Sequence, residues 1–278
     1  MSQPPPPSSR WPPPYKAAVS FTMDNLGEAQ DVLNGKWPHP IGTHPAVTNQ
    51  LPRMLSLLDK HNIKATYFAE SWSLSVYPDA IKSLQRAGHE VAWHGYQHEV
   101  WKDLSAEAEQ ENFDKSWEAA DKAGIEYEGF RPPGGSINDR TWGMLREHGV
   151  KYVSPLGELG AGKKGVVTLP FEWRGVDAFW YMDKFSGIRK DHGEKEKLET
   201  PEEDFKRWLL GKIEEIKETG GYLSVLFHPF LQTTEDRFAV LEEVLGEIAT
   251  EEDIWVANCK EVASWVSEHP DLFEARMK

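Results

Sequence analysis

The sequence predicts an α/β protein, a distorted (β/α) barrel of seven or eight strand–helix units. Short apolar runs alternate with segments of helical periodicity along most of the chain, without an internal repeat or a break in composition. Strands joined by crossover helices run parallel. No glycine-rich phosphate loop follows the first apolar run, which favours a barrel over an open nucleotide-binding sheet.

The expected strands are short and rich in apolar or β-branched residues. They cover residues 16–23, 64–70, 89–94, 126–131, 150–155, 165–173, 222–230 and the beginning of 254–270. The expected helices have apolar residues at helical spacing and cover 46–62, 78–88, 105–124, 138–149, 200–220, 236–249 and the end of 254–270. Ser105 is the expected N-cap and Gly124 the stop of the third helix, while Thr200 precedes a proline and three acidic residues at the start of the fifth.

Composition bounds the domain organisation and the partners. Residues 1–15 are rich in proline and are expected to form an extended arm, with residues 16–278 as a single barrel domain. The net charge of −14 argues against nucleic acid or an anionic membrane as the partner. One cysteine excludes an internal disulfide, and neither a signal peptide nor an apolar membrane span is seen. These features predict a cytoplasmic protein if Met1 is the natural start, and they leave a homo-oligomer open.

Polar residues follow several of the predicted strands. They are Asp24 and Asn25, Glu70, His94 and His98, Arg131, and His228. In barrels of this kind, chemistry collects at the carboxyl ends of the strands. We therefore expect these side chains to converge on one face, although two histidines four residues apart are a weak signal alone.

Four separated segments resemble the NodB-homology polysaccharide deacetylases (carbohydrate esterase family 4). They are FTMDN at 21–25, HGYQH at 94–98, FRPPGG at 130–135 and LFHP at 226–229, in the order of the family motifs. The family fold is a distorted (β/α) barrel, in agreement with the element pattern. The HGYQHE form is closer to the branch that includes allantoinase-like and cyclic-imide hydrolases.

The resemblance implies a divalent metal held by His94 and His98, either Zn²⁺ or another ion such as Co²⁺, Mn²⁺ or Ni²⁺. The family has two adjacent aspartates, a general base followed by a metal ligand, where this chain has Asp24 and Asn25. We prefer Asp24 as the base and Asn25 as the third ligand. In the alternative, Asp24 binds the metal and another carboxylate, such as Glu28, acts as base. An uncharged amide predicts weaker zinc binding, which an aspartate at position 25 is expected to tighten.

The roles of Arg131 and His228 follow from the same resemblance, whereas that of Gly134 is inferred from the local sequence. Arg131 pairs with Asp24 and keeps it ionised. Gly134 supplies the first backbone N–H after Arg131, because prolines occupy the two positions between them, and it is the expected oxyanion donor.

His228 is the expected acid that protonates the departing amine, and Asp177 is the candidate that orients it. Trp173 and Trp180 are candidate substrate contacts. The long loop at 26–45 is expected to border the pocket.

The predicted function is metal-dependent hydrolysis of carbon–nitrogen bonds other than peptide bonds, with an N-acyl group, expected to be acetyl, removed from a saccharide or small-molecule amide. Ring opening of a cyclic imide or ureide is the first alternative. A metal-free carbohydrate-binding barrel is the second, because of Asn25. A serine hydrolase is not favoured, because the chain has no G-x-S-x-G segment.

Overall fold

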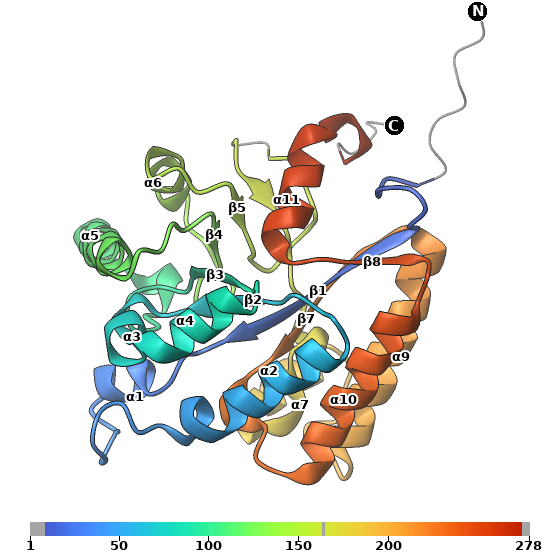
Figure 1. The fold of residues 1–278 in the computed structure, drawn as a ribbon, viewed down its shortest axis with the longest axis horizontal. Coiled ribbons are helices and arrows are strands. Elements are labelled where there is room, and N and C mark those ends of the chain that lie inside the picture. Colours follow the sequence, from blue (N-terminus) through green and yellow to red (C-terminus); the bar gives the residue numbers. More distant parts are fainter. Residues whose placement is uncertain (1–8, 163–164, 274–278) are drawn as a thin grey trace, which may run out of the picture.

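The computed structural model describes residues 9–162 and 165–273, which form a parallel sheet surrounded by helices (Figure 1). The strand order is β6-β5-β4-β3-β2-β1-β7, and β8 also pairs with β1. Every paired strand is parallel to its neighbour. The predicted α/β class with crossover helices is confirmed.

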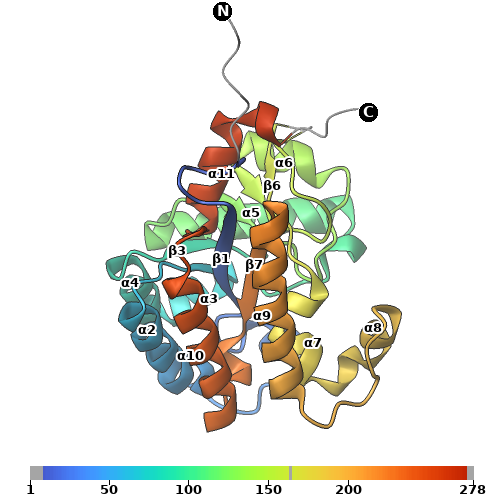
Figure 2. The same ribbon diagram turned by 90° about the vertical axis from the view of Figure 1, so that its right-hand side faces the viewer.

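The strands differ greatly in length, and three of them have only two residues. They are β1 (Ala17–Asp24), β2 (Thr66–Ala69), β3 (Glu90–Trp93), β4 (Gly129–Phe130), β5 (Tyr152–Val153), β6 (Val167–Thr168), β7 (Tyr222–Phe227) and β8 (Ile254–Val256). The helices are α1 (Ala29–Leu33), α2 (Leu51–Lys60), α3 (Ser71–Val76), α4 (Pro78–Arg86), α5 (Ala106–Ala123), α6 (Thr141–Glu147), α7 (Asp177–Tyr181), α8 (Ser186–Asp191), α9 (Pro201–Thr219), α10 (Glu235–Thr250) and α11 (Cys259–Glu268). Figures 1 and 2 show α2, α10 and α9 side by side outside β1 and β7.

The central strand β1 has two different faces. Its residues Val19, Phe21 and Met23 belong to the main hydrophobic core. Because side chains alternate across a strand, Thr22 and Asp24 point to the opposite face, and there they meet polar groups of other strands. The alternation in the sequence therefore places polar side chains inside the curved sheet near the end of β1.

The barrel is distorted where it closes. The ordered path of the sheet ends at β6 and β7. Between them, residues 169–176 make single parallel bridges, Leu156 with Phe171 and Val176 with Leu226. An irregular segment thus completes the ring in place of a regular strand, which agrees with the predicted distorted barrel.

The N-terminal segment packs on the body of the protein. The indole of Trp11 is 1% exposed, and its N–H donates to the Gly220 carbonyl over 3.0 Å. Its ring contacts those of Tyr222, Trp255 and Phe273. Of the predicted arm at 1–15, residues 1–8 lie outside the described residues. No described helix is long and apolar enough to cross a membrane.

A close approach between β4 and β5 generates a stability prediction. A Cβ atom on Gly129 would overlap the ring of Tyr152, whereas one on Gly143, in α6, would meet open space. We expect G129A to lower the free energy of unfolding by about 1–3 kcal/mol through overpacking. The control G143A should raise it by about 0.4–1 kcal/mol. Urea denaturation checks both, and an unchanged midpoint for G129A would contradict the packing described for β4.

Candidate active site

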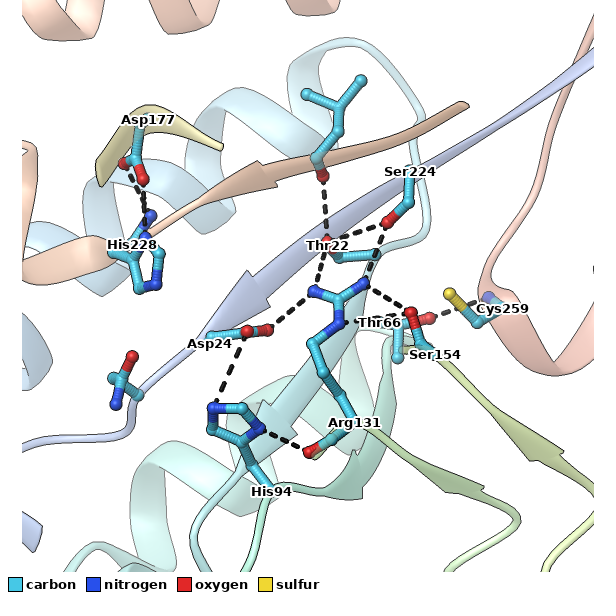
Figure 3. A network of polar contacts seen from close by, with 12 residues as sticks. Thr22, Asp24, Thr66, His94, Arg131, Ser154, Asp177, Ser224, His228 and Cys259 are labelled. Carbon is cyan, nitrogen blue, oxygen red and sulfur yellow. Dashed lines mark hydrogen bonds and ion pairs between the residues drawn. The ribbon is translucent and has the colours of Figure 1, made fainter. Parts of the chain in front are cut away.

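The polar residues at the carboxyl ends of the strands lie close together (Figure 3). Asp24 is the last residue of β1, His94 follows β3, Arg131 follows β4 and His228 follows β7. The expected convergence of Asp24, His94 and Arg131 is visible as direct contacts, because the Asp24 carboxylate lies 2.8 Å from Arg131 and 3.7 Å from the His94 ring.

Arg131 is the centre of the cluster and is fully buried. Its Nη1 donates to Asp24 Oδ1 over 2.8 Å and to Thr22 Oγ1 over 2.9 Å. Its Nη2 donates to Ser224 and Ser154, and its Nε also donates to Ser154. The guanidinium lies over the ring of Phe68, 4.1 Å from its centroid. All these contacts fix the orientation of the Asp24 carboxylate.

His94 has one ring nitrogen occupied and the other directed at Asp24. Its Nδ1–H donates to the Arg131 carbonyl over 2.7 Å, which leaves the lone pair on Nε2. That Nε2 is 3.7 Å from Asp24 Oδ2. Burial lowers the pKa of His94 to about 3. The ring is therefore neutral near pH 7, as a metal ligand must be.

His98 lies against His94, with 4.9 Å between the ring centroids. Burial, and after it the neighbouring His94, lowers the pKa of His98 to about 3. Its Nδ1 is 2.6 Å from the side-chain amide of Gln30, on α1. The amide nitrogen Nε2 of Gln30 faces the ring and donates, so Nδ1 accepts and holds the lone pair of the neutral His98 ring.

Asn25 has the left-handed backbone conformation, with φ of 64°, which asparagine tolerates better than most residues. Its side-chain Nδ2 donates to Glu70 Oε1 over 2.9 Å. Glu70 is 1% exposed, and burial raises the pKa of its carboxyl to about 7 against the hydrogen bonds that it accepts. The hydrogen bond to Glu70 thus fixes the orientation of the Asn25 side-chain amide, with its nitrogen toward Glu70.

The Glu28 carboxylate is held by hydrogen bonds from its own loop and from Tyr77. Its two carboxylate oxygens accept hydrogen bonds from the Gly42 N–H over 2.7 Å and from the Tyr77 hydroxyl. These bonds tie the 26–45 loop to the residue that precedes α4. The alternative in which Glu28 is the base therefore gains no support from its contacts.

His228 and Asp177 form the second polar pair. Asp177, the first residue of α7, accepts from the His228 ring Nδ1 over 2.6 Å and from the His228 backbone N–H over 2.7 Å. Gln232 donates to the same carboxylate. Burial lowers the pKa of His228, but the charge and hydrogen bond of Asp177, together with Asp24, outweigh it, so the pKa is raised.

The remaining predicted residues differ in how well their positions suit the expected roles. Gly134 is exposed with φ of 79°, and its N–H donates to no group among the described residues. Trp173 is half-buried and packs on Phe171. Trp180 does not fit the role of a substrate contact at this cluster. It is 4% exposed, it packs on Phe205, and its N–H is used by the Arg174 carbonyl.

The donor set fits a divalent cation. Two neutral imidazoles and the oxygens of Asp24 and Asn25 are ligand types that zinc and its neighbours accept. Among the described residues, Glu214, Glu247 and Glu251 bring three carboxylates within 4.8 Å of one another at the surface, and Lys217 pairs with two of them. That surface group is an ion-pair network, and the ligand atoms of Asp24, His94 and His98 are spaced more widely.

Sequence reasoning missed several partners of the site. Glu70 was recognised at the end of a strand but received no role, and Gln30 and the serines around Arg131 were not found. Ser154 and Ser224 follow or lie in apolar strands, which is a signal for an inward polar contact. No feature of the sequence connects Gln30 with the site, because its position depends on the path of the backbone after β1.

Comparisons with known proteins show that this chain is similar to polysaccharide and peptidoglycan deacetylases. Residues 40–153 match the family model described as polysaccharide deacetylase. A peptidoglycan deacetylase of Helicobacter pylori is 34% identical over 103 residues, which are 37% of this chain and 35% of that protein. A peptidoglycan-N-acetylglucosamine deacetylase of Bacillus cereus is 30% identical over 40% of this chain and 51% of its own. The matches thus span well under two thirds of these curated relatives.

Solved structures match most of the chain. A protein described as a candidate polysaccharide deacetylase from Mycobacterium smegmatis has a TM-score of 0.77 and 28% identity, over 94% of this chain and 92% of its own. Puue allantoinase has a TM-score of 0.75 over 96% of both chains, and at 19% identity it shows the fold alone. A family 4 pseudoenzyme from Bacillus anthracis has a TM-score of 0.57 and 20% identity, over 90% of this chain and 66% of its own.

The His228–Asp177 pair generates a prediction about protonation. In the native protein, His228 should titrate above its ordinary pKa of 6.5. The stabilisation from the pair is then complete below about pH 6.5 and is lost as the pH rises through the raised value. In D177N, burial dominates and the pKa should fall below 6.5. NMR titration of the imidazole signals measures this shift, with the exposed Asp183→Asn as control. An equal pKa in D177N and the native protein would contradict the pairing.

Proposed function

This chain is related to the NodB-homology polysaccharide deacetylases, and from that premise we propose that it is a metal-dependent hydrolase of carbon–nitrogen bonds other than peptide bonds. Its substrate is an N-acylated sugar or small amide, and acetate is the expected acid product. The observation that carries the proposal is the presence of two oriented proton-transfer groups, Asp24 held by Arg131 and His228 held by Asp177, beside two neutral histidines.

His94, His98 and the amide oxygen of Asn25 would hold the cation. When bound, a divalent cation polarises the acyl carbonyl and makes water a better nucleophile. The two histidines are suited to this because burial keeps both rings uncharged, and His94 is fixed by its bond to the Arg131 carbonyl.

Asp24 is the general base of the proposal. Its Oδ1 is held by Arg131, and its Oδ2 faces the His94 ring across 3.7 Å. One carboxylate oxygen is therefore fixed and the other is available to accept a proton from the attacking water. The guanidinium keeps the fixed oxygen in place through a 2.8 Å ion pair.

His228 is the general acid. Its Nδ1–H is taken by Asp177, so Nε2 is the nitrogen that can donate a proton to the amine as the carbon–nitrogen bond breaks. The raised pKa of His228 keeps more of the ring protonated near neutral pH. The unused N–H of Gly134 is a donor for the developing oxyanion.

A product assay tests the proposed reaction. Purified protein loaded with Zn²⁺ or Co²⁺ is offered N-acetyl sugars, peptidoglycan fragments and cyclic imides, and its metal content is measured. We expect acetate release from at least one N-acetylated compound and loss of activity on chelation. Ring opening without acetate would instead support the imide alternative. Absence of bound metal together with inactivity after metal addition would support the metal-free binding barrel.

Substitutions test the assigned roles separately. H94A and H98A should lose both metal and activity, because each removes an imidazole ligand. D24N should keep the metal and lower kcat by about 10²–10⁴-fold, since it removes only the base. His269, which stacks on Trp265 at the end of α11, provides the control H269A. If D24N loses the metal, Asp24 is a ligand and its assignment as the base is wrong.

A further inference from the structure

Glu70 is a buried carboxylate at the candidate site to which the proposed reaction gives no role. It follows β2 directly and is 1% exposed. Its Oε1 accepts from the Asn25 side-chain amide over 2.9 Å, and its Oε2 accepts from the Leu26 backbone N–H over 2.8 Å. Each of the two adjacent donors thus meets its own oxygen of the one carboxylate.

These bonds determine which way the Asn25 amide points. Since the amide nitrogen faces Glu70, the carbonyl oxygen Oδ1 points away from Glu70. Within the part of the chain that the structure describes, Oδ1 accepts no hydrogen bond, whereas the backbone carbonyl of Asn25 is held by the Tyr67 hydroxyl over 2.9 Å. The side chain therefore presents a free oxygen from a fixed backbone.

We infer that Glu70 is a positioning residue for the metal site, which holds the Asn25 side chain with its amide oxygen free to bind the cation. This inference rests on the proposed function. A carboxylate that accepts from the amide nitrogen polarises the amide and increases the charge on its oxygen. Glu70 then acts on the cation through Asn25, as partners of metal ligands commonly do.

The same geometry explains why an asparagine is compatible with this site. An aspartate at position 25 would set its carboxylate against that of Glu70, at the distance of a hydrogen bond but with no donor between them. An exchange of the two groups removes this conflict. In N25D/E70Q, the amide introduced at position 70 would donate to the carboxylate introduced at position 25, and the carbonyl of that amide would accept from the Leu26 N–H.

A four-protein comparison tests the inference by metal affinity. Zn²⁺ and Co²⁺ dissociation constants are measured for the native protein, E70Q, N25D and N25D/E70Q by competition with a chromophoric chelator, and the Co²⁺ absorption spectrum reports the ligand set. We expect E70Q to bind about 10–100-fold more weakly. The contact with Glu70 revises the expectation from the sequence that an aspartate at position 25 tightens binding, so N25D alone should gain no affinity. The double variant should bind at least as tightly as the native protein.

Glu90 provides a matched control for the loss of a buried carboxylate. It lies at the start of β3, at the opposite end of the strands from Glu70, and accepts hydrogen bonds from Thr66 and Tyr152. E90Q should leave metal affinity within about twofold, because it has no contact with a proposed ligand. Circular dichroism confirms folding. Should E70Q alone not fold, the comparison of N25D with the double variant still decides.

The outcomes separate this inference from the proposed function. Native protein that binds neither Zn²⁺ nor Co²⁺ would overturn the proposed function and, with it, this inference. If the native protein binds metal but E70Q matches E90Q, or N25D tightens binding equally in both backgrounds, the positioning role of Glu70 is wrong while the metal site stands.

Discussion

A buried guanidinium is the constraint on which the candidate site depends. Arg131 makes five hydrogen bonds, to Thr22, Asp24, Ser224 and twice to Ser154, and its own carbonyl accepts from His94. These partners come from β1, β7 and the ends of β3 and β5. Breaking a buried ion pair by removing one partner costs about 3–5 kcal/mol. The arrangement of the candidate site and the packing of these strand ends therefore both depend on the Arg131 side chain.

The two residues proposed to transfer protons have partners of opposite charge. Asp24 pairs with a permanent cation, since its carboxylate lies 2.8 Å from the Arg131 guanidinium. His228 faces the carboxylate of Asp177, which favours the protonated ring. The residues proposed as base and acid thus form ion pairs of opposite sense in one buried cluster. The two histidines beside them are neutral, because burial lowers the pKa of both rings to about 3.

Sequence reasoning predicted what depends on strand order and periodicity. The parallel arrangement, the position of Asp24, His94, Arg131 and His228 at strand ends, and the pairing of Arg131 with Asp24 follow from apolar runs and from short motifs. It also paired Asp177 with His228. These contacts lie at the ends of strands and helices that short stretches of sequence are sufficient to predict.

The features that it missed depend on irregular backbone. Short helices such as α1 and α3 lie in segments that were expected as loops, so Gln30 was not connected with His98. The role of Glu70 requires the left-handed backbone at Asn25, which turns the amide and the Leu26 N–H toward it. Trp180 was a candidate because it belongs to a local aromatic cluster, and such a cluster does not show which ring enters the core.

The central claim is that distant segments of the chain hold one cation with a mixed nitrogen and oxygen ligand set. X-ray absorption spectroscopy of the zinc-loaded protein measures that set directly. We expect scattering from two imidazoles with oxygen atoms in the remaining positions, and from one imidazole around any metal retained by H98A. A ligand set without imidazole, such as carboxylates alone, would place the metal elsewhere and contradict the account.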